Sequence, residues 1–274
     1  MGIVVAVTVG AVVIIAATGL GGSPPGTSVI SKSTSPTSAP FPVGVLDPAE
    51  PSGLAPPTAS ALRGYQLVYE SDFNGSHLPN GWTSFAGVPT GASTGPLAPS
   101  HVVVHGGLLV LRTYRDPAYA NQWVSGGLCQ CGDPRTYGAF FVRSRITGPG
   151  PSAVSLLWPA SNVWPPEIDF DENGGNARGT SATVHFGPAD QIEQHSISID
   201  MTRWHTWGII WTPTTITFTV DGQSWAQVTT PLEIPNVPMR LDLEQRTACG
   251  INLDCPSRPQ SLLVDWIAEY SLRH

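Results

Sequence analysis

The stretch that decides the fold is EIDFDE, residues 167–172, which follows two prolines and ends at an Asn-Gly-Gly turn signal. Side chains of an extended strand alternate between two faces, so Ile168 and Phe170 share one face while Glu167 and Asp169 share the other. Prolines fit the entry of a strand, and Asn and Gly fit the turn after it. The pattern therefore predicts a strand that buries its apolar face and turns its acids toward a cleft.

Glu172 is out of phase with this alternation, because it stands five positions after Glu167. A β-bulge at Phe170-Asp171 would return Glu172 to the acidic face, and bulges are frequent beside active sites. Without a bulge, Asp171 would take that place. Strand residues four apart are separated by roughly 13 Å at the backbone, and inward-leaning side chains can close most of that gap.

Short strand-like runs recur through the rest of the chain, with Gly, Pro, Asn or Asp between them. The runs cover residues 65–73, 101–114, 138–146, 153–158, 167–172, 181–187, 195–201, 206–211, 215–222, 223–230, 239–245 and 262–270. Nothing of helical period and length appears among them. A dozen short strands predict an all-β fold in which two large antiparallel sheets pack face to face as a β-sandwich.

The N-terminal part differs in composition from the rest. Residues 1–22 carry no charged side chain and hold an apolar run of roughly 18 residues, long enough for either a signal peptide or an uncleaved membrane anchor. Residues 23–63 are rich in Pro, Ser, Thr and Gly, and we predict a linker there. Residues 64–274 are then expected to form a single domain, either secreted or held at the outer face of the membrane.

Charge excludes several kinds of partner. The formal net charge is −7, and the only lysine, Lys32, lies in the predicted linker. Without a basic patch, nucleic-acid binding is not expected, and contact with a membrane is expected only through the N-terminal segment. Low charge and nine Trp residues suit a monomer that binds neutral, amphipathic ligands by stacking.

Four cysteines follow the export-type segment, and an even count in an oxidising compartment predicts disulfides. We expect a direct Cys129–Cys131 bond to be strained. Two arrangements stay open: a local Cys249–Cys255 bond that leaves two thiols, or cross-links between the two clusters. A zinc site is disfavoured by the spacing.

The acid cluster suits hydrolysis of a glycosidic bond. That chemistry needs one carboxylate as nucleophile and a second carboxyl group as proton donor, about 5–5.5 Å apart in a retaining enzyme. Acids packed together cannot all ionise cheaply, so their pKa values separate. The alternatives are a calcium site or a merely solvated acidic strand.

Neighbouring motifs favour hydrolysis, because WPPEIDFDE resembles the active-site strand of glycoside hydrolase family 16. The family pattern is Glu-x-Asp-x-x-Glu in its bulged, laminarinase-like subgroup. Further segments that resemble the family, in the family's order, are YESDFNG (69–75), TYGAFFVRSRI (136–146), SATVHFG (181–187), WHTWGIIWTPTTITFTVDG (204–222) and LLVDWIAEYS (262–271).

The resemblance implies a concanavalin-like jelly roll with a concave glycan-binding cleft. It implies that Glu167 is the nucleophile, Asp169 its helper and Glu172 the general acid/base of a double displacement, with no cofactor needed for catalysis. The expected activity is endo-hydrolysis of a β-linked polysaccharide, most simply a β-1,3-glucan. A cell-surface transglycosylase and a non-catalytic carbohydrate-binding sandwich are the alternatives.

Five further residues are candidates for substrate contact. Trp164 stands where the family stacks an aromatic ring on the sugar, and His185 faces away from its apolar neighbours. Trp158, Arg143 and Gln245 are weaker candidates for the cleft. For His205, Trp207 and Trp211, which alternate along one run, a core position is favoured over the cleft.

The resemblance also implies a structural calcium ion on the convex face. Its ligands would be Asp72, the backbone carbonyl of Gly107 and Asp265. The family usually has Glu where this chain has Asp72, one carbon shorter. Asp171 is a second departure, because the family usually has an apolar residue at the bulge.

Overall fold

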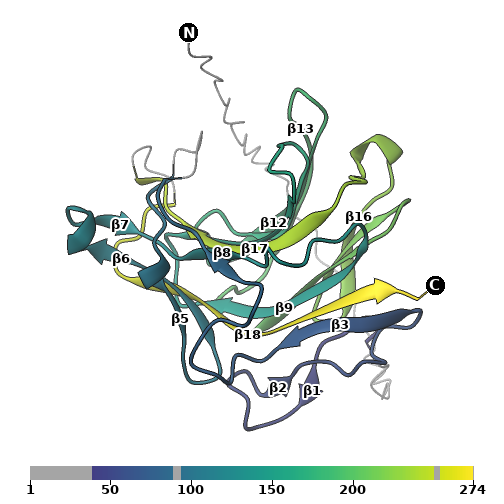
Figure 1. The fold of residues 1–274 in the computed structure, drawn as a ribbon, viewed down its shortest axis with the longest axis horizontal. Coiled ribbons are helices and arrows are strands. Elements are labelled where there is room, and N and C mark those ends of the chain that lie inside the picture. Colours follow the sequence, from purple (N-terminus) through teal and green to yellow (C-terminus); the bar gives the residue numbers. More distant parts are fainter. Residues whose placement is uncertain (1–38, 89–93, 250–253, 274) are drawn as a thin grey trace, which may run out of the picture. The chain divides into compact units, whose positions relative to one another are not determined.

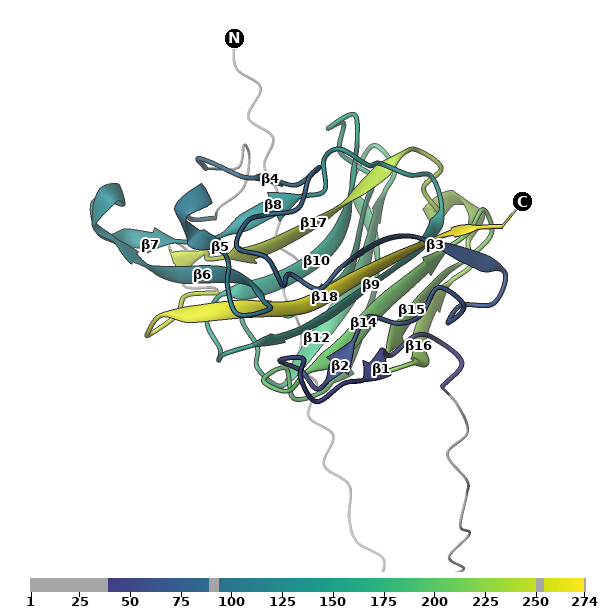
Figure 2. The ribbon, with the colours of Figure 1, turned by 60° about the horizontal axis from the view of Figure 1, so that its bottom comes forward.

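The computed structural model describes residues 39–88, 94–249 and 254–273. Two antiparallel sheets pack face to face in this part of the chain (Figures 1 and 2), which confirms the predicted all-β sandwich. One sheet has seven strands in the order β13-β12-β11-β10-β17-β8-β4. The other has nine, ordered β16-β15-β14-β9-β18-β6-β5, with β3 paired to β18 and β7 paired to β6.

Most of the strands match the predicted runs. The seven-stranded sheet contains β4 (Thr83–Ser84), β8 (Gly127–Cys129), β10 (Ser152–Pro159), β11 (Glu167–Glu172), β12 (Gly179–Phe186), β13 (Gln191–Ser198) and β17 (Met239–Arg246). The nine-stranded sheet contains β3 (Tyr65–Ser71), β5 (Val102–Val104), β6 (Leu109–Asp116), β7 (Gln122–Val124), β9 (Gly138–Ile146), β14 (His205–Trp211), β15 (Ile216–Val220), β16 (Gln223–Val228) and β18 (Gln260–Leu272). The single run predicted over 101–114 is two strands joined by a turn at Gly106-Gly107, where both glycines have positive φ.

Helical structure is sparse. The described residues include three 3₁₀ turns, at Pro99–His101, Pro117–Tyr119 and Pro231–Glu233. No helix among the described residues has the length and apolar character needed to cross a membrane. The predicted signal or anchor segment, residues 1–22, lies outside the described residues.

The main core fills the space between the two sheets. Ile168 and Phe170 of β11 are fully buried there, as their alternation predicts. They meet residues from the facing sheet, including Trp207 and Trp211 of β14. Burial of large side chains of this kind contributes about 1.5–3 kcal/mol each, and it fixes which face of β11 turns outward.

A second apolar cluster lies on the outer face of the nine-stranded sheet and is covered by residues 39–63, which we call the N-terminal strap. The strap forms a two-stranded sheet, β1 (Val45–Leu46) with β2 (Leu54–Ala55), and buries Leu62. Trp266 Nε1 donates to Leu54 O at 2.9 Å and Tyr270 Oη donates to Thr58 O at 3.1 Å. The linker predicted over 23–63 is therefore wrong for residues 39–63, because these few apolar side chains and backbone carbonyls have partners on the sheet.

Both disulfides are local. Cys129 is bonded to Cys131, with Cα atoms 5.0 Å apart, and Cys249 is bonded to Cys255, with Cα atoms 4.6 Å apart. These separations lie within the ordinary range for a disulfide. The expectation that Cys129–Cys131 would not form is wrong, since the chain leaves β8 at Cys129 and turns enough to bring the two residues together.

Candidate active site

A β-bulge on β11 brings three acids to one face. On the side that faces β10, Asp169 pairs with Leu156 and Asp171 pairs with Ser155. Phe170 has no partner of its own and is therefore the extra residue of the bulge. On the other side the register also shifts between Asp169 and Glu172. The predicted bulge is therefore present, and it returns Glu172 to the outer face of the sheet, which we call the acidic face.

Glu167 and Asp169 are buried on the acidic face, at 7% and 1% exposure. Trp164 Nε1 donates to Glu167 Oε2 at 2.7 Å, so Trp164 contacts the predicted nucleophile directly. His185, paired with Glu167 on β12, places Nε2 3.5 Å from Asp169 Oδ2 and Nδ1 2.8 Å from Asp190 Oδ1. The sequence-predicted residues Trp164, Glu167, Asp169 and His185 are thus brought together.

Burial separates the charge states of this cluster. It raises the pKa of Glu167 to about 8, with a further contribution from the charge of Asp169. Burial and the charge of Glu172 likewise raise the pKa of Asp169. Burial disfavours the charged form of His185, but the neighbouring carboxylates of Asp169, Glu167 and Asp190 outweigh it and raise the pKa of His185 to about 9. At neutral pH Glu167 of the free protein therefore holds a proton, and the imidazole of His185 beside it is cationic.

Arg246, which the sequence reasoning did not select, lies beside the acids. Its guanidinium forms an ion pair with Glu172, and its Nε is 3.7 Å from Glu244 Oε2. The positive charge of Arg246 also opposes the rise in the pKa of Glu167 and Asp169. Arg246 is thus the main cation in contact with the acidic face at Glu172.

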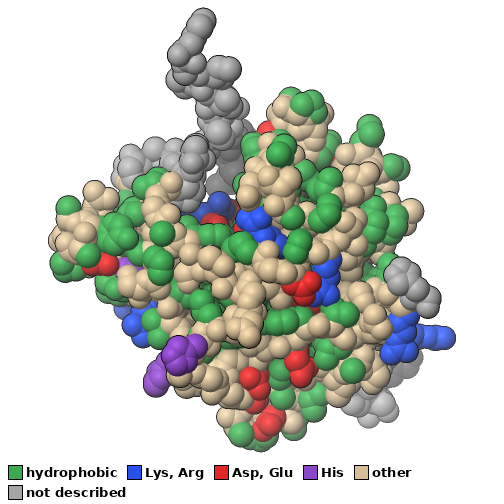
Figure 3. All heavy atoms as spheres, viewed as in Figure 1, with side chains coloured by type: hydrophobic (Ala, Val, Ile, Leu, Met, Phe, Trp, Pro, Cys, Tyr) green, Lys and Arg blue, Asp and Glu red, His purple; other side chains and the backbone are tan. Residues whose placement is uncertain are grey.

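Strand β17 sends a row of charged side chains to the same face. Asp242 pairs with Leu156 and Arg240 pairs with Trp158 across β10. Arg240 Nε is 3.2 Å from Asp242 Oδ1. Figure 3 shows acidic and basic side chains side by side near the upper edge of the molecule.

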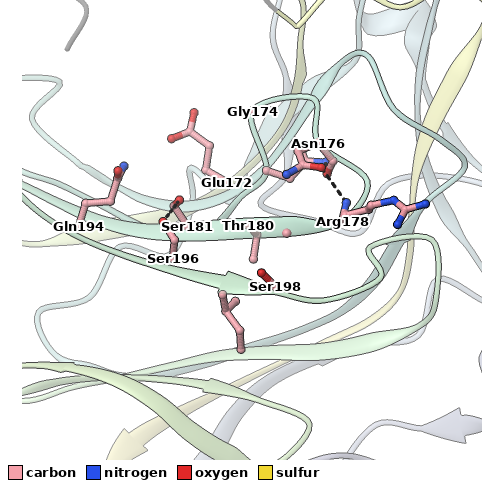
Figure 4. A pocket seen from close by; sticks show the side chains of 12 residues that line it. Glu172, Gly174, Asn176, Arg178, Thr180, Ser181, Gln194, Ser196 and Ser198 are labelled. Carbon is pink, nitrogen blue, oxygen red and sulfur yellow. Dashed lines mark hydrogen bonds between the residues drawn. The ribbon is translucent and has the colours of Figure 1, made fainter. Parts of the chain in front are cut away.

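A polar cavity of about 450 Å³ opens next to Glu172. Figure 4 shows Glu172, Ser181 and Gln194 projecting toward the same side from β11, β12 and β13. Ser181 Oγ is 2.9 Å from Ser196 Oγ, and Gln194 Nε2 donates to Thr183 Oγ1 at 2.9 Å. Hydroxyl and amide groups of this kind suit the hydroxyls of a sugar.

The three weaker cleft candidates fall in different places. Trp158 lies on the acidic face, where it donates to Asn162 Oδ1 at 3.2 Å. Arg143 is wrong as a cleft residue, because β9 belongs to the other sheet and its guanidinium bonds Ser52 of the strap and Thr206. Gln245 is wrong as well, because it points between the sheets, fully buried, 2.8 Å from Thr113 Oγ1.

The residues favoured as core are indeed inside. Trp207 and Trp211 belong to the main core, and His205 Nδ1 bonds Asp221 at 2.7 Å. Asp171, at the bulge, is 1% exposed and accepts a 2.7 Å hydrogen bond from Thr180 Oγ1. Burial raises the pKa of Asp171 to about 7. Asp171 thus points away from the acidic face, and Glu172 takes the outward place.

The residues proposed for calcium come near one another on the opposite sheet. Asp265 accepts from Ser52 N at 3.1 Å, while its Oδ1 is buried without a hydrogen-bond partner. Burial raises the pKa of Glu50, and the charges of Asp265 and Asp72 add to this effect. The orphaned oxygen suits a cation, yet the described residues contain no group of three or more His, Cys, Asp or Glu arranged to hold a metal. Calcium binding therefore stays a proposal that needs backbone oxygens such as that of Gly107.

Comparisons with known proteins agree with this geometry. Residues 98–266 match the family model described as glycosyl hydrolases family 16. The chain is 31% identical over 144 residues to the endo-1,3-1,4-beta-glycanase ExsH of Rhizobium meliloti, which covers 50% of this chain and 31% of that protein. The chain is 28% identical to the endo-1,3-1,4-beta-glycanase EglC of the same organism, with the same coverage. The match thus spans about a third of the length of these curated relatives.

Solved structures share the fold. An endo-beta-1,3-glucanase from Pyrococcus furiosus superposes with a TM-score of 0.65 at 21% identity, over 76% of this chain and 95% of that one. A laminarinase from Flavobacterium sp. UMI-01 gives 0.66 at 22% identity, over 75% and 100%. The family model covers more than half of the sequence, and its matched range contains the bulged strand and most of both sheets. The chain therefore belongs to family 16 of the glycosyl hydrolases.

Proposed function

We propose that this protein is an endo-acting hydrolase of β-linked glucan that works with retention of configuration. The observation that carries the proposal is the bulge on β11, which turns Glu167 and Glu172 to the same face with Asp169 between them. Two carboxyl groups on one face of a single strand suit nucleophilic attack followed by hydrolysis of a glycosyl-enzyme intermediate.

The protonation states of the acids support different roles for Glu167 and Glu172. Attack needs Glu167 ionised, while departure of the leaving sugar needs a proton on Glu172. In the free protein burial keeps the proton on the Glu167 side, and Arg246 pairs with Glu172. We infer that substrate binding moves the proton from Glu167 toward Glu172, with Asp169 as the relay, and that Glu172 leaves Arg246 to meet the glycosidic oxygen.

The substrate we favour is a β-1,3-linked glucan. Both curated relatives are named as endo-1,3-1,4-beta-glycanases, and the two structures compared above are named as an endo-beta-1,3-glucanase and a laminarinase. The rim of the acidic face offers Trp164, 38% exposed, as a platform for a sugar ring. Export is supported by the apolar segment at 1–22 and by both disulfides.

The test is a panel of polysaccharides scored for new reducing ends, run with the wild type and with Glu167→Gln and Glu172→Gln. We expect release of oligosaccharides from laminarin and loss of at least about a thousandfold in kcat for either variant. The proposal fails if either variant keeps near wild-type turnover. Product lengths separate hydrolysis from the transglycosylase alternative, which would lengthen some oligosaccharides.

A further inference from the structure

A second pocket lies on the outer face of the nine-stranded sheet. It has a volume of about 460 Å³ and is lined by Ser52, Arg143, Arg145, Thr202, Arg203 and Trp204. Arg143 and Arg145 alternate on β9 with Val142 and Ile146, which face the main core, so both arginines point outward. The sandwich core thus separates this pocket from the acidic face.

The lining of this pocket is basic in an acidic protein. The chain has 13 Lys and Arg against 20 Asp and Glu, yet three arginines and no acid line this one pocket. Three acids near the pocket accept hydrogen bonds from other groups: Asp265 Oδ2 from Ser52 N, Asp221 from His205, and Asp200 from Thr202. The second oxygen of Asp265, Oδ1, has no partner. Among the described residues none of these acids forms a salt bridge with the arginines of the pocket.

The three arginines of the pocket differ in how many of their N–H groups have hydrogen-bond acceptors. Arg143 donates to Ser52 Oγ at 2.6 Å and to Thr206 Oγ1 at 3.1 Å. Among the described residues neither Arg145 nor Arg203 forms an ion pair, and Arg145 Nε is buried without a hydrogen-bond partner. A buried N–H without an acceptor is costly, and a bound anion would supply the acceptor.

Trp204 adds an apolar wall beside these donors. The guanidinium of Arg145 lies over one face of its ring, 5.2 Å from the centroid, so the indole and this cation lie side by side in the pocket. A guanidinium fork matches the two oxygens of a carboxylate, and indole carbon packs against the C–H face of a pyranose. One ligand class satisfies both: a sugar ring that bears a carboxylate.

We propose that this pocket is a second, non-catalytic site that binds an acidic saccharide through Arg145, Arg203 and Trp204. Such a site goes beyond hydrolysis of neutral glucan and does not depend on it. It would hold the protein on a carboxylated polymer while the acidic face acts on a neutral one.

The test is titration calorimetry of the full chain with trigalacturonate, and with maltotriose as the neutral probe. We expect trigalacturonate to bind with an affinity that falls as salt rises, and maltotriose not to bind. Arg145→Gln and Arg203→Gln should each weaken binding roughly tenfold, since each removes a charged donor. Arg63→Gln, which removes an exposed charge outside the lining, should leave the affinity unchanged.

Release of reducing ends from laminarin is measured on the same samples and should not change in the pocket variants. The proposal is overturned if trigalacturonate binds no better than maltotriose, or if both pocket variants bind like the wild type. Because Arg203 is exposed, its variant remains informative even where Arg145→Gln lowers the melting temperature. If the wild type does not hydrolyse laminarin, this counts against the proposed function but not against the saccharide-binding pocket.

Discussion

Replacement of Asp171 by Asn should stabilise the protein relative to the wild type, and this advantage should grow as the pH rises. Asp171 is buried behind the bulge, and burial raises its pKa from 3.8 to about 7. Asn keeps the shape of the side chain and the oxygen that accepts from Thr180, but it cannot ionise. The variant therefore removes one titration and little else.

The magnitude follows from linkage between proton binding and folding. Between pH 3.8 and about 7 the folded protein keeps the proton on Asp171 while the unfolded chain releases it, so stability falls as the pH rises. A shift of about three pH units, at about 1.4 kcal/mol each, sets an upper bound of about 4 kcal/mol on this loss. The Asp171→Asn variant escapes the loss, so its advantage should be near zero at pH 4 and greatest at pH 8.

The assay is equilibrium unfolding in guanidinium chloride, followed by Trp fluorescence at pH 4, 5.5, 7 and 8 with the disulfides intact. Glu70→Gln, at an exposed site, is the matched control and should show no such trend. A stability advantage of Asp171→Asn that stays flat with pH would refute the reasoning. Turnover should stay within about twofold of wild type, and a loss as severe as that of Glu172→Gln would mean that Asp171 is the outward acid.

Three more outcomes are expected. Trp164→Phe should lower kcat roughly tenfold with little change in KM, because it removes the hydrogen bond to Glu167 and keeps an aromatic ring; an unchanged kcat would contradict that role. Arg246→Gln should move the acidic limb of the pH profile of kcat/KM upward by about one pH unit, because the positive charge of Arg246 favours ionised Glu167. A downward shift would contradict this role of Arg246. Calcium at about 100 times its Kd should raise the melting temperature by roughly 5–10 °C in the wild type but not in Asp265→Asn, as measured by calorimetry with and without EGTA.

Alternation within single strands predicted the centre of the site well. Ile168 and Phe170 could be assigned to the core from their side chains alone, and this placed Glu167 and Asp169 outward. The phase error of Glu172 was enough to require the bulge. His185 followed from the same rule, because Val184 is core and the residue after it must face the other way.

The errors at Arg143 and at the Cys129–Cys131 bond depend on information that a single strand does not contain. Alternation places Arg143 opposite Val142, but it does not say which of the two sheets β9 joins. Gln245, by contrast, was predictable from its own strand, because Leu243 and Leu241 are two and four positions away and share its inward face. The same alternation turns Arg246, the next residue, to the outer face and would have selected it. The Cys129–Cys131 disulfide depends on a turn that the spacing of the cysteines does not reveal.

The N-terminal strap has a practical consequence for producing the protein. A shortened chain that begins at residue 64 would uncover Trp266 and Tyr270 and leave the indole and phenol donors without their acceptors. Gly44 shows how closely the strap is fitted, since a Cβ atom there would lie 3.0 Å from the Trp266 ring. A recombinant catalytic domain should start no later than residue 39, and shorter versions should be recovered as insoluble or protease-sensitive material.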